Sequence, residues 1–310
     1  MPLTEERKMV TKSDFYGIDQ YTLSTPHISV TVMTLGATVK SIIFKGRELT
    51  LNYGTKDEYM TTTCYPGALV GRYANRIKDG KININGKEYQ LDKNNGANHL
   101  HGGFNGSDKK IWTVTETTEN SVYMEYFSPD GESGYPASLT MGVRYTVENN
   151  RFRIDFYGES DGDTVYAPTT HTYFNLAGTP TVHGTKITIN AEKYVPVDVD
   201  LIPTGEILPT EGVFDFKTGR ALEENYDHCF ILAGRNSFCA EAGDVKMTFT
   251  TDFPALQLYT GEFLKDGFNK NSGFAAEPEY CPDSPNRECF ESPLLKKGEK
   301  FEKFVEYLFF

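Results

Sequence analysis

The stretch KININGKEYQL, residues 81–91, indicates which kind of fold this chain adopts. Asn85-Gly86 lies near its middle, and this pair readily takes the two positive-φ positions of a tight turn between antiparallel strands. The stretch is therefore expected to form a β-hairpin. The two-residue periodicity on either side extends the same interpretation to most of the chain.

Alternation of apolar and polar residues recurs along the sequence, as in HISVTVM at 27–33. Further strands are expected at residues 39–44, 143–147, 152–157, 186–189, 245–250, 256–259 and 301–310. Helical patterning is confined to single turns at 57–60 and 221–225. Many short strands separated by Gly, Asn and Pro predict an all-β fold, an antiparallel sandwich or a related body. No linker, repeat or shift in composition divides the sequence, so residues 1–310 are expected to form a single domain.

The composition favours a folded protein without a polyanionic partner. The chain has 310 residues, 38% hydrophobic and 13% aromatic, which is enough to fill a core. Its 31 Lys+Arg against 43 Asp+Glu give a net charge of −12, which argues against nucleic acid or an anionic membrane as a partner.

The location expected from the sequence is cytoplasmic. The opening residues MPLTEERKMV lack the apolar core of a signal peptide, and no apolar run is long enough to cross a bilayer. The five cysteines show no C-x-x-C spacing, and their odd number fits reduced thiols better than a disulfide framework.

The run THTYFNL, residues 170–176, combines a histidine, a phenol and an amide. If it forms a strand, His171, Tyr173 and Asn175 share one face. A buried histidine in such a run is either a hydrogen-bonded structural residue or an acid–base catalyst, and the residue types alone leave both interpretations open.

The run GRYANRI, residues 71–77, places two arginines four positions apart. Arg72 and Arg76 are therefore expected to share a face. Two interpretations stand: a surface salt-bridge pair, or an arginine fork that binds sugar or carboxylate oxygens.

The run NHLHGG, residues 98–103, raises the question of a metal, because alternate residues of a strand can aim both imidazoles in one direction. A cupin-type site needs a glutamate a few residues later, and Gly102-Gly103 followed by Phe104 does not supply one. The glycines indicate a close backbone approach or a turn instead.

Two acidic positions complete the candidate residues. Asp227 precedes an apolar run and is either the cap of a turn or an acceptor for substrate hydroxyls. Glu277 follows the small apolar run at 273–276 and is expected to be partly buried. Burial can move a carboxyl pKa toward neutrality, where the group serves as a general base; a salt bridge at a rim is the alternative.

Taken together, these stretches resemble the aldose 1-epimerase (galactose mutarotase) family over nearly the whole chain. No single motif is decisive, but the ordered set is specific. The motifs in chain order are LGATV at 35–39, GRYANRI at 71–77, NHLHGG at 98–103, SPDGESGYP at 128–136, HTYFNLAG at 171–178, LIPTGE at 201–206, YDHCF at 226–230, LQLYTGEF at 256–263 and GFAAEPEYCPDSPN at 273–286.

The resemblance implies a large antiparallel β-supersandwich with very little helix and an open cleft for a free hexose such as galactose or glucose. The implied reaction interconverts the α and β anomers through the open-chain aldehyde and needs no metal or organic cofactor. By motif, Glu277 is the base that takes the proton from the C1 hydroxyl, and His171 is the acid that protonates the ring oxygen. The two roles reverse on ring closure, so both pKa values must lie within reach of neutral pH.

The resemblance also implies a set of sugar-binding residues and gives Arg72 and Trp112 structural roles. Arg76 and His101 together can stabilise charge that develops on the ring oxygen. The implied substrate-binding residues are Asn75, Arg76, His101, Asp227 and Gln257.

Two positions depart from the family pattern and put the sugar preference in doubt. Thr170 stands where many members have asparagine, and Glu279 stands where a glutamine is common. In a strand Glu279 shares a face with Glu277, so its charge would raise the pKa of the expected base.

The rivals are a hexose-phosphate epimerase, a non-catalytic sugar-binding module on the same fold, and a metal-dependent cupin isomerase. The first calls for a basic cluster at the cleft, and the second for loss of the acid or the base. Whether the protein is a monomer or a homodimer, and which sugar it prefers, stay open.

Overall fold

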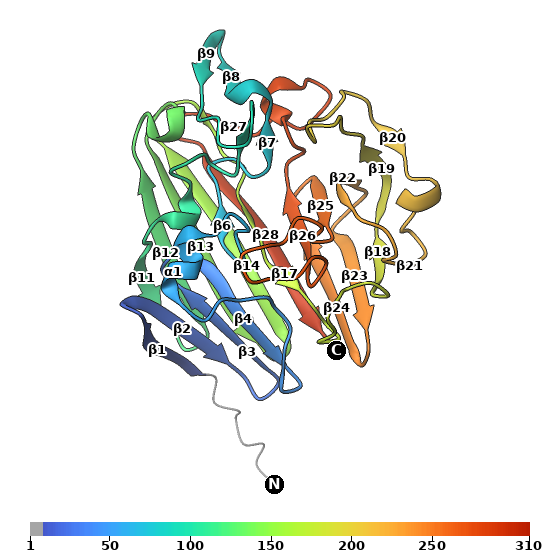
Figure 1. Ribbon diagram of the computed structural model, residues 1–310. Helices are drawn as coiled ribbons and strands as arrows, with labels where there is room; N and C mark the ends of the chain where they lie inside the picture. Colours follow the sequence, from blue (N-terminus) through green and yellow to red (C-terminus); the bar gives the residue numbers. More distant parts are fainter. Residues whose placement is uncertain (1–8) are drawn as a thin grey trace.

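The computed structural model describes residues 9–310, and within them nearly all regular structure is β (Figure 1). The largest sheet has nine strands, and every pairing between its neighbours is antiparallel. In spatial order its strands are β11 (Thr113–Thr117), β12 (Ser121–Ser128), β13 (Leu139–Glu148), β14 (Arg151–Ser160), β28 (Lys300–Phe309), β24 (Val245–Thr251), β23 (Asn236–Ala242), β18 (Lys186–Ile189) and β21 (Arg220–Ala221).

Two further antiparallel sheets lie against this one. The five-stranded sheet comprises β1 (Met9–Phe15), β2 (Ile18–Ser24), β3 (Ile28–Met33), β4 (Thr38–Phe44) and β5 (Arg47–Glu48). The six-stranded sheet runs in the order β17 (Tyr173–Phe174), β26 (Phe274–Glu279), β25 (Ala255–Tyr259), β22 (Asp227–Leu232), β19 (Ala191–Val195) and β20 (Leu208–Pro209). In Figure 1 the five-stranded sheet (blue) lies near the β11–β13 end of the large sheet.

Apolar side chains between these layers form one continuous core. Tyr145 on β13 is fully buried and donates its hydroxyl to the carbonyl of Ala37, beside β4. At the other end, Phe238 on β23 lies 6.2 Å from Phe274 on β26, ring centre to ring centre. The structure confirms the antiparallel β-supersandwich.

Short elements complete the chain. Four strand pairs flank the main sheets: β7 (Arg76–Ile77) with β10 (His99–Leu100), β8 (Lys81–Ile84) with β9 (Lys87–Gln90), β6 (Leu69–Val70) with β16 (Thr169–Thr170), and β15 (Thr164–Val165) with β27 (Leu294–Leu295). The α-helix of the described residues is α1 (Lys56–Thr61), and 3₁₀ turns occur at Lys78–Gly80, Ser107–Lys109, Glu132–Gly134, Gly212–Phe214 and Ser284–Asn286. Over residues 9–310, no helix has the length and apolar character needed to cross a membrane.

The expected hairpin and strands are confirmed. Asn85 and Gly86 have φ angles of 54° and 82° and connect β8 to β9, as the Asn-Gly pair predicts. The helical turn at 57–60 is present as α1, where Thr55 and Glu58 form a capping box. The helical turn at 221–225 is wrong, because Arg220–Ala221 pairs with β18 as an edge strand.

Arg72 and Arg76 do not share a face, which corrects the expected arginine pair. The side chain of Arg72 is 3% exposed and points into the segment 128–137. Its guanidinium donates to the carbonyls of Ser128, Pro129, Pro136 and Ala137 and to the hydroxyls of Ser128 and Thr164, at 2.8–3.3 Å. Arg72 therefore ties this segment to the core.

We expect Arg72→Met to lower the free energy of unfolding by at least about 3 kcal/mol, because several buried carbonyls lose their donor at once. Chemical denaturation followed by tryptophan fluorescence measures this loss. Lys81→Ala is the control, because Lys81 pairs with Glu88 on an exposed hairpin and its loss should barely move the midpoint. Equal midpoints for the Arg72 variant and the wild type would contradict the structural role.

Candidate active site

A cleft of about 860 Å³ opens beside the six-stranded sheet, at the strands that carry Asp227, Gln257 and Glu277. Gln257 on β25 pairs with Glu277 on β26, and Asp227 on β22 pairs with Tyr259 on β25. The walls come from segments far apart in the sequence, at 63–65, 75–76, 94–98, 100–101 and 199–201. All seven residues singled out from the sequence line this one cleft: Asn75, Arg76, His101, His171, Asp227, Gln257 and Glu277.

His171 lies where the chain changes from one sheet to another. β16 ends at Thr170 and β17 begins at Tyr173, so residues 171–176 do not form the single strand on which the shared face of His171, Tyr173 and Asn175 depends. The backbone of His171 is held on both sides: its N–H donates to the Ala68 carbonyl at 2.9 Å, and its carbonyl accepts from the Gly67 N–H at 2.8 Å. This fixes where the imidazole enters the cleft.

The two residues that follow His171 on its expected face behave differently. Tyr173 does line the cleft, and its ring centre is 4.8 Å from that of His171. Asn175 turns away and donates its amide to the carbonyls of Thr179 and Ser272 at 2.6 and 2.8 Å. Asn175 therefore supports the connection after β17 and takes no part in the cleft.

His171 and Glu277 face each other at the bottom of the cleft. Nε2 of His171 is 3.7 Å from Oε1 of Glu277, close enough for charge coupling but too long for a direct hydrogen bond. Burial lowers the pKa of His171 to about 4. Burial raises the pKa of Glu277 well above its usual value, and the nearby Asp227 carboxylate raises it further. The protein environment alone therefore favours a neutral carboxyl beside a neutral imidazole.

A left-handed turn at Asn75 presents Arg76 and His101 to the cleft. Asn75 has φ = 68°, its side-chain oxygen accepts from the Arg76 N–H at 2.8 Å, and its own N–H donates to Nδ1 of His101 at 3.1 Å. Since Nδ1 of His101 accepts, its Nε2 carries the proton and can donate into the cleft. Gly102 has φ = 91°, and a Cβ there would overlap the carbonyl oxygen of Gly71, so the close approach expected from the glycines is present.

Arg76, Asp227 and Gln257 form a polar wall of the cleft. Nη2 of Arg76 is 3.7 Å from Oδ2 of Asp227, and Nε2 of Gln257 donates to Oδ1 of Asp227 at 2.5 Å. Among the described residues, the buried side-chain atoms without a protein partner include Nδ1 of His171, Oε1 of Gln257 and Oε2 of Glu277. Such atoms are costly unless a ligand or water bonds to them, and here they come from three residues of the same cleft.

The H-x-H pair does not converge. His99 is fully buried away from the cleft, between the Tyr135 hydroxyl at 2.6 Å and the Asp92 carbonyl at 2.8 Å. His101 faces the cleft instead. Within residues 9–310, no three His, Cys, Asp or Glu side chains come together in a way that could hold a metal ion.

The sequence missed several aromatic residues of the cleft. Tyr65 has φ = 56°, and its ring centre lies 4.8 Å from that of His101 and 5.9 Å from that of His171. Tyr259 and Phe263 also line the cleft. Tyr65 and Phe263 lie in loops, where alternation gives no signal, and only the strained backbone of Tyr65 marks it as unusual.

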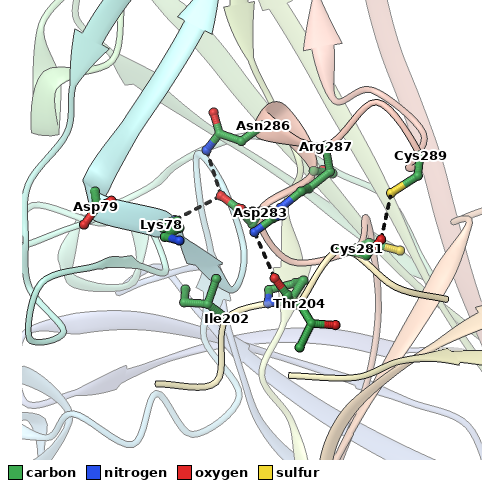
Figure 2. A network of polar contacts seen from close by, with 12 residues as sticks. Lys78, Asp79, Ile202, Thr204, Cys281, Asp283, Asn286, Arg287 and Cys289 are labelled. Atoms are coloured by element: carbon green, nitrogen blue, oxygen red, sulfur yellow. Dashed lines mark hydrogen bonds and ion pairs between the residues drawn. The ribbon is translucent and has the colours of Figure 1, made fainter. Parts of the chain in front are cut away.

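A buried network ties the cleft walls together (Figure 2). Asp283 is fully buried; its N–H donates to the Arg76 carbonyl at 2.8 Å, and its carboxylate accepts from the Lys78 N–H at 3.0 Å. The same carboxylate accepts from Arg287 Nε at 2.8 Å, and Arg287 also donates to the Pro203 carbonyl. Asp283 thereby holds β7, which carries Arg76, beside the loop that contributes residues 199–201 to the cleft.

Comparisons with known proteins show which sequences and structures the chain resembles. A sequence model of the family described as aldose 1-epimerase matches residues 19–308. The chain is 36% identical to the galactose mutarotase of Bos taurus, with 94% of each chain covered. It is 33% identical to the aldose 1-epimerase of Haemophilus influenzae, covering 82% of this chain and 83% of that one. The crystal structure of an aldose epimerase homologue from C. elegans superimposes with a TM-score of 0.89 at 27% identity, covering 98% of this chain and 99% of the other.

Proposed function

Because the chain belongs to the aldose 1-epimerase family, we propose that its cleft binds a free hexose and that Glu277 and His171 open and close the sugar ring. The protein is an isomerase that interconverts sugar anomers. The observation that supports the two catalytic roles is the 3.7 Å separation of the imidazole and the carboxyl at the bottom of the cleft. Galactose is the first proposed substrate, on the name of the relatives called galactose mutarotases, and glucose is proposed beside it as another free hexose.

The reaction needs one proton on the Glu277–His171 pair. For ring opening, ionised Glu277 takes the proton of the C1 hydroxyl while protonated His171 donates to the ring oxygen, and the C1–O5 bond breaks. This leaves an open-chain aldehyde, a neutral carboxyl and a neutral imidazole. After rotation about the C1–C2 bond, the carboxyl returns its proton to the carbonyl oxygen while the imidazole takes the proton of the C5 hydroxyl.

The directions in which the cleft shifts the two pKa values suit the open-chain stage of the reaction. Burial raises the pKa of Glu277 and lowers that of His171, so both groups are drawn to their neutral forms. These are the forms that face the aldehyde. The cleft therefore holds the Glu277–His171 pair in the protonation state that accompanies the open-chain intermediate.

The proposed sugar-binding roles rest on the hydrogen-bond donors and acceptors that the cleft residues offer to sugar hydroxyls. Asp227 offers carboxylate oxygens to sugar hydroxyls, Gln257 adds an unpaired buried carbonyl oxygen, and His101 adds an N–H donor. Arg76 lies beside Asp227 and contributes positive potential to the same wall. Donors and acceptors in one cleft match the hydroxyls of a hexose, each of which can donate and accept a hydrogen bond.

We expect Asp227→Ala to raise KM roughly 10–100-fold with a smaller change in kcat, because hydrogen bonds to hydroxyls are lost in ground state and transition state alike. Initial rates over a range of hexose concentrations separate the two constants. Asp215→Ala on the surface is the matched control. An unchanged KM for the Asp227 variant would remove Asp227 from the proposed binding set.

A hexose-phosphate epimerase is the alternative within the same chemistry. Of the described residues that line the cleft, Arg76 and Lys265 are the cationic ones, and Arg76 is already engaged by Asp227. Exchange NMR on glucose and glucose 6-phosphate distinguishes the substrates, since it measures anomer interconversion at equilibrium. We expect faster exchange for the free sugar; exchange of the phosphate ester alone would favour the alternative.

A further inference from the structure

Glu279 is a buried carboxyl that the reaction described above does not use. Its side chain is fully buried, and it lies two positions after Glu277 on the same face of β26. Its Oε1 accepts from Nδ2 of Asn75 at 2.9 Å, while its Oε2 has no hydrogen-bond partner among the described residues. A fully buried carboxyl with one neutral amide as its protein partner is an expensive place for a charge.

We propose that Glu279 works as a neutral carboxylic acid, a positioning residue that holds Asn75 and, through it, the turn that presents Arg76 and His101. This inference rests on the proposed function of the cleft. The chain of contacts is continuous: Glu279 holds the Asn75 amide, the Asn75 side-chain oxygen holds the Arg76 N–H, and the Asn75 N–H holds Nδ1 of His101.

Asn75 needs this anchor because of its backbone. It adopts φ = 68°, a left-handed conformation that costs free energy for a residue with a side chain. The hydrogen bond to Glu279 ties its side chain to the rigid strand β26, and the bonds to Arg76 and His101 then follow from the turn. If the anchor is lost, both cleft residues lose their fixed direction, and the tautomer of His101 is no longer set by the Asn75 N–H.

Burial and the neighbouring carboxyls favour the neutral form of Glu279, and they outweigh the Asn75 amide and Arg76, which favour the charged form. Glu277 on its own strand and Asp227 on β22 would repel a negative charge. The buried Cys229 thiol on β22 and the buried Tyr73 hydroxyl near β7 also face it. Arg76 is the cation nearby, and it is shared with Asp227. Burial accordingly raises the pKa of Glu279 to about 8.

A neutral Glu279 also protects the base. If Glu279 were ionised, its like charge would raise the pKa of Glu277 and disfavour the carboxylate that takes the C1 hydroxyl proton. A neutral glutamic acid has nearly the same shape as a glutamine and offers the same acceptor oxygen, and like glutamine it carries no charge. The acidic residue at 279 is thus compatible with general-base catalysis two residues away.

The test compares Glu279→Gln with Glu279→Ala, using Glu119→Gln in an exposed turn as the control. At pH 7 we expect the glutamine variant to keep wild-type kcat/KM within about threefold, because the acceptor for Asn75 remains. The alanine variant should lose roughly tenfold or more, mainly through KM, because Asn75 is released. A glutamine variant as impaired as the alanine variant would overturn the proposal, since it would mean that the charge is required.

Two measurements without sugar check the protonation state directly. The folded pKa of Glu279, about 8, is above the unfolded value, so the wild type loses stability as pH rises between these values. The equilibrium constant for unfolding of the wild type, divided by that of Glu279→Gln, should therefore rise with pH across this window. The ratio should rise by up to roughly tenfold per pH unit. The infrared difference spectrum of the two proteins at pH 6 should show the carbonyl stretch of a protonated carboxyl.

The outcomes separate the two proposals. A relative unfolding constant that does not change with pH, or a difference spectrum with a carboxylate band only, would overturn the neutral Glu279. A wild type that interconverts no aldohexose anomers would instead overturn the proposed function of the cleft, and the sugar-free measurements would still report on Glu279.

Discussion

Glu277→Gln is expected to lower kcat/KM for the free hexose by about 10²–10⁴, the usual contribution of a positioned general base. The amide keeps the shape and the acceptor oxygen of the side chain but cannot take the C1 hydroxyl proton. Sugar binding should persist, because Asp227, Gln257 and His101 are untouched, so the loss should fall on kcat rather than KM. Progress of the optical rotation from pure α-anomer measures both constants.

The control for this change is Glu119→Gln, because Glu119 is exposed and does not line the cleft. It should keep wild-type rates. Nearly unchanged activity in Glu277→Gln would show that another group takes the proton. Glu279 would be the next carboxyl to test. If Glu279 proved to be the base, the neutral role inferred for it would also be wrong.

His171→Asn is expected to reduce kcat by a similar factor of about 10²–10⁴, because the ring oxygen loses its proton donor. Asparagine can still donate a hydrogen bond, so binding should change little. His27→Asn, at an exposed turn, is the matched control and should be silent. A His171 variant with wild-type kcat would leave His101, whose ring centre is 5.3 Å from that of His171, as the candidate acid.

The pH dependence gives a second readout for His171. Its pKa in the free cleft is lowered to about 4 and the pKa of Glu277 is raised, so the pair shares one proton at pH values between the two. As pH falls toward about 4, the imidazole binds a second proton while the carboxyl stays protonated, and no base remains. Wild-type kcat/KM should therefore be flat near neutrality and fall at the acid end.

The two residues act as one proton-transfer unit, so their effects should not add. The double variant should be little slower than the slower single variant, as found for groups that depend on each other within one step. Losses that multiply would mean that the two residues act in separate steps.

Much of the fold could be predicted from the sequence because its signals are local. Alternation identified the strands at 27–33 and 245–250, and the Asn-Gly pair fixed the hairpin at 81–91. The turn at 221–225 failed because pairing with β18, across more than thirty residues of sequence, overrides a short helical pattern. The break at His171 was equally invisible, since it depends on the chain leaving β6 to join β26.

The cleft also depends on contacts between distant segments, which leave no local signal in the sequence. The motif resemblance named seven residues that meet in space, although their segments are spread from 75 to 277. It gave Arg72 a structural role and Arg76 a place in the binding set, but it did not reveal Tyr65 or the carbonyls that the buried Arg72 guanidinium binds. It flagged Glu279 as a like-charge neighbour of Glu277, but the bond to Asn75 joins residues 204 positions apart and has no signature in sequence.

Polarimetry of freshly dissolved α-galactose and α-glucose tests the proposed chemistry most directly. Purified wild-type protein at catalytic concentration should accelerate the approach to equilibrium rotation for at least one of the two sugars, while Glu277→Gln and His171→Asn at the same concentration should leave a rate close to that of buffer alone. Rotation that changes no faster with the wild type than in buffer, for both sugars, would contradict anomer interconversion of free hexoses by this cleft.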